Sequence, residues 1–175
     1  MNVPDDRVLD LRSVFRLTAT IVTPSAETDG AYVEMDVTAL PGSRTTIHRH
    51  PEQEETYQVL AGTLEVFHEG QWRKVSSGES LSVSAGSIHG FRNTTEAPVR
   101  FMNVHRPALG FQSHLETLDQ LVKVGKIKGV KDPRSLIYMS MSAVEHQHDV
   151  SVKPPQRLVD TLAAIGRRLR MQLTD

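Results

Sequence analysis

The chain contains no cysteine and carries almost no net charge. Without cysteine there can be no disulfide framework, and any metal site must be built from nitrogen and oxygen ligands. The 20 basic and 21 acidic residues nearly cancel, which argues against broad electrostatic binding to nucleic acid. We therefore expect a small-molecule partner and no nucleic acid.

Long apolar runs are also missing. No uninterrupted apolar stretch is long enough to cross a membrane, and the first residues show no basic stretch leading into an apolar run. We expect a soluble, cytoplasmic protein with no membrane partner. The length of 175 residues suits one domain with a sizeable core.

Segments rich in β-forming residues recur at short intervals from residue 14 to residue 104, the first of them at residues 14–22 and 31–40. This rhythm predicts an antiparallel β-sandwich or barrel. The turn signals that separate the segments are Pro41-Gly42, Ala61-Gly62, Glu69-Gly70, Ser77-Gly78, Ala85-Gly86 and Ala97-Pro98.

Two histidines and a glutamate lie close together in the first half of the chain. Because side chains alternate along a β-strand, His48 and His50 point to the same side and can share one ion. Pro51 cannot donate a hydrogen bond within a sheet, so we expect the strand to end there. The chain then turns back and brings Glu55 onto the neighbouring strand. This segment predicts a metal site with three ligands.

A second segment, residues 78–93, adds one more histidine. Its apolar residues alternate with serines, as in a half-buried strand. Gly86 permits a turn, after which His89 shares a face of the next strand with Phe91. His89 is therefore the fourth candidate ligand.

Both segments resemble the two motifs of the cupin superfamily. The first motif reads Gly, five residues, His-x-His, three or four residues, Glu, six residues, Gly, and the chain matches it at every anchor. The second reads Gly, five residues, Pro-x-Gly, two residues, His, three residues, Asn. It is matched by Gly78, Gly86, His89 and Asn93, whereas Ser84 replaces the proline. The resemblance covers roughly residues 30–108.

This resemblance implies an all-β fold, the cupin jelly-roll barrel (double-stranded β-helix), with a C-terminal helical extension in this chain. It also implies one metal ion held by His48, His50, Glu55 and His89. The expected organisation is an N-terminal arm and first strand at residues 1–28, the cupin barrel with both motifs at 29–108, and a helical extension at 109–175.

Three imidazoles and one carboxylate suit a divalent iron, manganese, nickel, copper or zinc ion, and without thiolates its identity stays open. Family members with this ligand set include quercetin-type dioxygenases, decarboxylases and isomerases. The resemblance therefore favours a metal-dependent, dioxygenase-like oxidoreductase acting on a small organic molecule. The alternatives are a metal-dependent isomerase or cyclase, and a non-enzymatic barrel that binds a small ligand. Cupin sensors usually carry a helix-turn-helix domain, and the C-terminal part shows no evident basic recognition helix.

Four residues are candidates for the wall of the pocket. Met102 could equally face outward. His105 ends the last expected strand and is either structural, or supports the ligands or contacts a substrate. The four candidates are Tyr57, Phe91, Met102 and His105.

After Pro107 the apolar residues recur at helical spacing and predict three amphipathic helices. We expect the helices to cover the barrel, to pack on a second subunit, or both, and we expect a homodimer. The third stripe should be buried, because exposing it would leave a large apolar patch in water. The stripes are Phe111, Leu115, Leu118, Leu121 and Val122; then Leu136, Ile137, Met141 and Val144; then Leu158, Val159, Leu162, Ile165, Leu169 and Leu173.

The remaining histidines are expected at the surface. His146 and His148 share the spacing of the ligands but lie in a helical pattern, where residues two apart do not face each other. His68 precedes a turn, and His114 lies on a predicted helix.

Overall fold

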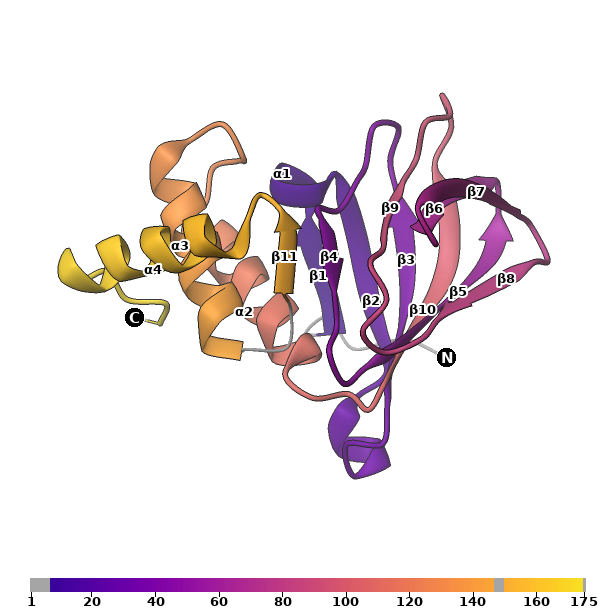
Figure 1. Cartoon of the computed structure of the whole chain (residues 1–175), viewed down its shortest axis with the longest axis horizontal. Helices are drawn as coiled ribbons and strands as arrows, with labels where there is room; N and C mark the ends of the chain where they lie inside the picture. The colour runs from indigo at the N-terminus through magenta and orange to yellow at the C-terminus, as the bar shows by residue number, and fades with distance from the viewer. Residues whose placement is uncertain (1–6, 147–149, 175) are drawn as a thin grey trace.

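The larger of the two facing β-layers is a six-stranded antiparallel sheet. The computed structural model describes residues 7–146 and 150–174 of the chain, and Figure 1 shows this sheet running through its strand-rich half. The order is β1-β2-β3-β10-β5-β8. The strands are β1 (Val8–Leu11), β2 (Leu17–Thr23), β3 (Val33–Ala39), β10 (Val99–Arg106), β5 (Glu54–Ala61) and β8 (Ser80–Val83).

The opposite layer is made of shorter strands. One sheet has the order β7-β6-β9, and β4 pairs with β11 beside it. Two isolated bridges, His48 with His89 and Arg44 with Arg92, connect the β4 segment to the β9 segment. These strands are β4 (Ile47–Arg49), β6 (Thr63–His68), β7 (Gln71–Ser76), β9 (Gly90–Arg92) and β11 (Val150–Lys153).

The core fills the space between the two layers. Strand β3 shows the cause: Val33, Met35, Val37 and Ala39 are buried, while the residues between them are partly exposed. This period of two places every second side chain in the interior. The predicted antiparallel arrangement of strands is confirmed.

The helices gather on one side of the strands, beside β1 (Figure 1). Helix α2 is fixed to this edge because the buried carboxylate of Asp119 accepts a hydrogen bond of 2.8 Å from the Asp10 backbone N–H. Helix α3 packs on α2, and α4 packs on α3 and β11. The helices are α1 (Arg12–Phe15), α2 (Phe111–Lys123), α3 (Pro133–His146) and α4 (Gln156–Arg168), with a 3₁₀ turn η2 (Ser25–Thr28).

The predicted apolar stripe on α4 is only partly buried within the single chain, and burial of the rest in a dimer stays a prediction. Leu158, Ile165 and Leu169 are 48%, 42% and 64% exposed. The buried residues of α4 are Val159, which belongs to the predicted stripe, and Ala163 and Gly166, which do not. Small residues are needed on the face that packs on α3, because α3 lies very close to it: a Cβ on Gly166 would meet side chains of α3.

Three short elements were not expected from the sequence. Val14 and Phe15, expected to begin a strand, lie in α1, and β1 precedes them. Strand β11 pairs with β4 from a part of the chain where only helices were expected.

Within residues 7–146 and 150–174, no helix combines the length and apolar character needed to cross a membrane.

Candidate metal centre

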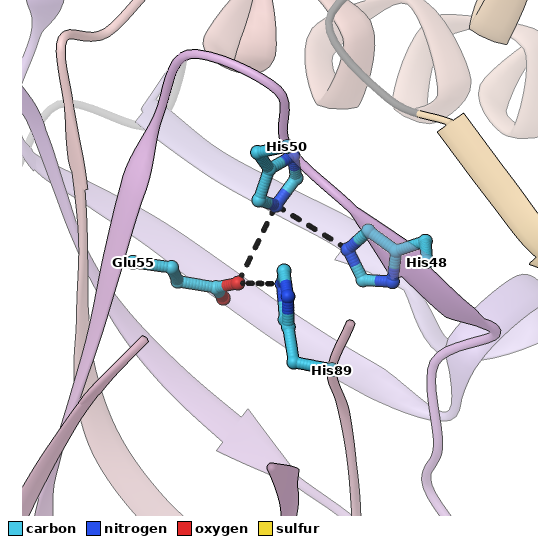
Figure 2. Close-up of side chains that lie close together, drawn as sticks. All are labelled: His48, His50, Glu55 and His89. Atoms are coloured by element: carbon cyan, nitrogen blue, oxygen red, sulfur yellow. Dashed lines mark hydrogen bonds and ion pairs between the residues drawn. The ribbon is translucent and has the colours of Figure 1, made fainter. Parts of the chain in front are cut away.

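Two neighbouring connections, from β4 to β5 and from β8 to β9, bring the four expected ligand residues together. His48 lies on β4, His50 follows it, Glu55 lies on β5, and His89 directly precedes β9. Each offers one nitrogen or oxygen atom, and these atoms all lie within 4.8 Å of one another. Figure 2 shows the side chains pointing toward a common point. His50, Glu55 and His89 are buried, whereas His48 is partly exposed, so a small molecule would approach from the His48 side.

Backbone carbonyls orient two of the rings. The Nδ1 of His48 lies 2.8 Å from the Thr46 carbonyl oxygen, and the Nδ1 of His89 lies 2.8 Å from the Ser87 carbonyl oxygen. A carbonyl only accepts, so each Nδ1 donates its hydrogen, and each Nε2 of a neutral ring presents a lone pair. Metal-binding histidines are typically held in this way.

At the centre, a carboxylate oxygen of Glu55 faces imidazole nitrogens, an arrangement that a positive charge between them would stabilise. The Oε2 atom of Glu55 lies 2.7 Å from Nε2 of His89 and 3.4 Å from Nε2 of His50. Despite the short distance, neither Glu55 Oε2 nor His89 Nε2 has a partner with hydrogen-bond geometry, and both atoms are buried. A carboxylate oxygen facing a nitrogen lone pair is repulsive unless a proton or a cation lies between them. The donor set therefore fits a divalent metal ion.

The Glu55 carboxyl is set up to stay ionised. Burial alone would raise its pKa, but the charge of His105 and the polar groups of His105, His50 and His89 close to the carboxylate outweigh that effect. The pKa of Glu55 is therefore held well below its usual range. An ionised carboxylate is the form that binds a metal ion.

A polar network lies behind Glu55, and the sequence revealed only part of it. Asn103 Nδ2 donates to Glu55 Oε1 over 2.9 Å, and Nε2 of the fully buried His105 lies 3.3 Å from the same oxygen. The Nδ1 of His105 is 2.8 Å from Oε1 of Gln53. His105 and Asn103 could be noticed because they share a strand face, but nothing in the sequence singled out Gln53.

The pocket candidates fall into two groups. Tyr57 and Phe91 lie inside and form an aromatic cluster with Phe101, with ring centroids 5.3–6.0 Å apart. Met102 lies on the opposite face of β10 from Phe101 and His105 and is only partly buried, so it faces away from the ligands.

One of the other histidines differs clearly from its expected surface position. His114 is buried, with Nδ1 2.9 Å from the Ser142 hydroxyl, because α3 packs over this face of α2. His146 is partly buried, with Nε2 3.2 Å from the Thr117 hydroxyl, and His68 is also partly buried. His148 lies outside the described residues.

Comparison with known protein sequences shows similarity over the strand-rich part. Residues 35–105 match the family model described as Cupin domain. A protein of Aquifex aeolicus (strain VF5), named as uncharacterized, is 36% identical over 52 residues, 30% of this chain and 43% of that protein. Quercetin 2,3-dioxygenase of Bacillus subtilis (strain 168) is 29% identical over 72 residues, 41% of this chain and 21% of that protein. The chain thus spans less than half of the length of each of these relatives.

Solved structures show the same fold at low sequence identity. The polyketide cyclase RemF from Streptomyces resistomycificus superposes with a TM-score of 0.52 and 22% identity, over 61% of this chain and 77% of that chain. A predicted oxalate decarboxylase from Thermotoga maritima gives 0.50 and 18%, over 52% of this chain and 80% of that chain. These likenesses show a jelly-roll β fold. Residues 35–105 thus match a cupin domain in sequence, and the strands of the chain share the fold of these solved structures.

Proposed function

We propose that the protein is a metal-dependent oxidoreductase of the dioxygenase type, acting on a small organic molecule. The observation that carries the metal-dependent part is the convergence of four ligand atoms within 4.8 Å, with two imidazoles held so that Nε2 faces inward. The similarity to a quercetin 2,3-dioxygenase favours oxygen chemistry on an aromatic or enol-containing substrate.

In this proposal His48, His50, Glu55 and His89 hold one divalent transition metal ion. When bound, such an ion polarises a coordinated substrate or supplies redox chemistry with dioxygen. The chain's own residues set the conditions around it. Glu55 contributes a negative charge that its low pKa maintains, and burial of His50 and His89 keeps bulk water from the inner side.

Access to the centre follows from the unequal exposure of the ligands. Tyr57 and Phe101 are buried on the sheet that carries Glu55, Phe91 contacts both from the opposite sheet, and Phe111 covers His105. Of the four candidate ligand residues, only His48 is partly exposed. A substrate therefore reaches the centre past His48, and the part of it that reacts is shielded by apolar rings, which favours a planar, largely apolar molecule.

Oxygen uptake by metal-loaded protein tests the proposed chemistry. Protein purified without added metal is analysed for its elements, and then loaded with iron, manganese, copper or nickel. Oxygen consumption is measured with a panel of flavonols, catechols and enolic diketones. Uptake that depends on one of these metals and on one substrate class is expected.

Two other results would replace the proposal by an alternative function. Native zinc, with substrate conversion but no oxygen uptake, would indicate a metal-dependent isomerase or cyclase. Tight binding of an organic ligand without turnover under any metal would indicate a non-enzymatic binding protein.

A further inference from the structure

The two oxygens of Glu55 face different surroundings. Oε2 faces the rings of His89 and His50, at 2.7 and 3.4 Å. Oε1 points the other way, where Asn103 Nδ2 donates to it over 2.9 Å and His105 Nε2 lies 3.3 Å away. One oxygen is thus aimed at the ligand cluster, and the other is bound by the protein.

His105 is itself fixed by an anchored amide. Gln53 Nε2 donates to the carbonyl oxygens of Pro107 and Ala108 over 2.7 and 2.9 Å. Its Oε1 therefore accepts, and Nδ1 of His105 must be the donor across the 2.8 Å contact. On the other side of the ring, Nε2 lies 2.9 Å from Oδ1 of Asn103. Contacts on both ring nitrogens define the plane of the imidazole.

The C-terminal part of the chain supplies a further contact to the His105 ring. Phe111, the first residue of α2, stacks on His105 with ring centroids 3.5 Å apart and planes at 20°. The same ring meets His50 edge-on, with centroids 6.0 Å apart. Helix α2 therefore closes the space into which the His105 ring could turn, and links the C-terminal helices to the ligand cluster.

We propose that His105, anchored by Gln53 and covered by Phe111, is a positioning residue that holds Glu55 with only Oε2 available to the metal ion. The inference rests on the proposed metal site and adds the residues that set its geometry. If His105 no longer faced Oε1, the carboxylate could rotate and offer both oxygens, and a buried acceptor would lose a partner. Residues that orient metal ligands in this way typically change metal affinity by roughly 10–100-fold when they are replaced.

The test uses Co²⁺ as a probe, because its visible absorption bands report the coordination of the ion. His105→Phe removes both ring nitrogens but keeps an aromatic ring to stack on Phe111. We expect Co²⁺ affinity to fall by roughly 10–100-fold and the absorption bands to shift. His105→Gln, whose amide can still donate near Glu55, should recover most of the affinity and the original spectrum. Gln53→Leu should weaken binding in the same direction.

The matched control is His114→Phe, which replaces another buried histidine with a hydrogen-bonded Nδ1, away from the cluster. It should lower the melting temperature of the metal-free protein but leave Co²⁺ affinity and spectrum unchanged. A folded His105→Phe variant with wild-type affinity and spectrum would overturn the positioning role alone. If that variant does not fold, a wild-type result for Gln53→Leu overturns it in the same way. Wild-type protein that binds no Co²⁺ would instead overturn the metal site itself, and this inference with it.

Discussion

Among single residues, Glu55 keeps its charge at low pH. The pKa of Glu55 is held well below its usual range, so this carboxylate stays ionised after free histidines have become protonated. A carboxyl with a depressed folded-state pKa stabilises the metal-free fold above its unfolded value of about 4.3, and this stability is lost as the pH falls through the folded value. Protonation of Glu55 should therefore not be the event that first releases a bound ion in acid.

Metal occupancy should depend on pH, because protons compete with the metal ion for the imidazole ligands. Imidazole must be unprotonated to bind a metal, and free histidine titrates near about 6.5, so acidification should release the ion below that value. Bound metal is measured with a chromogenic chelator after equilibration between about pH 8 and about pH 3. Occupancy that stays constant across this range would be incompatible with histidine ligation.

Among secondary-structure elements, β4 and β9 determine how far His48 is from His89. Gly90 lies where the β4 and β9 segments run close together, and a Cβ on it would come 2.9 Å from the Thr46 carbonyl oxygen. That oxygen belongs to backbone and cannot swing away as a side chain would. The same Thr46 carbonyl oxygen orients the His48 ring, because it accepts a hydrogen bond from Nδ1 of His48.

Gly90→Ala should therefore push the two ligand strands apart. We expect a loss of roughly 1–3 kcal/mol in the free energy of unfolding, as for other overpacked sites, together with weaker metal binding. Gly166→Ala is the matched control, because its Cβ would meet the Met141 and Ile137 side chains between α3 and α4. Chemical denaturation and metal titration of both variants separate the effects. Equal metal affinity for both would show that strand spacing does not govern the site.

The sequence predicted the elements whose residues carry a periodic pattern or a motif. The alternation in β3 led to the right buried face, because strand geometry alone determines it. The four residues predicted to share a metal ion, His48, His50, Glu55 and His89, lie close together. Local patterns could not reveal the pairing of β11 with β4, in which Ser151 lies opposite His48, because that contact joins distant parts of the chain.

The burial of Ala163, Gly166 and His114 was missed for a related physical reason. Apolar spacing on α4 favoured the leucine stripe, but the close approach of α3 selects the face with Ala163 and Gly166. His114 is buried by the same helix layer, since Ser142 on α3 meets its ring. Which of two usable faces a helix buries depends on its neighbour, and the sequence of one helix does not contain that information.

For the whole molecule, the exposed stripe on α4 supports the expected homodimer as a proposal. Leu158, Ile165 and Leu169 are between 42% and 64% exposed, and pairing of two copies would remove them from water. Burying one such side chain stabilises an association by roughly 1.5–3 kcal/mol.

Replacing Leu158 and Ile165 by glutamate tests this pairing without disturbing the core, since both side chains are exposed. Light scattering should show a dimer for the wild-type chain and a monomer for the double variant, with a folded circular dichroism spectrum in both. A wild-type chain that is monomeric at high concentration would rule out the homodimer, and a double variant that remains dimeric would place its interface elsewhere.

The metal content of three purified proteins shows whether the cluster of His48, His50, Glu55 and His89 holds a metal ion. Wild type, His89→Ala and His114→Ala are expressed together, purified without added metal or chelator, and analysed for transition elements. We expect about one divalent ion per chain in wild type and in His114→Ala, and strong loss in His89→Ala, because His89 faces Glu55 whereas His114 contacts Ser142 on α3. Equal metal content in all three proteins, or none in wild type even after reloading, would contradict this expectation.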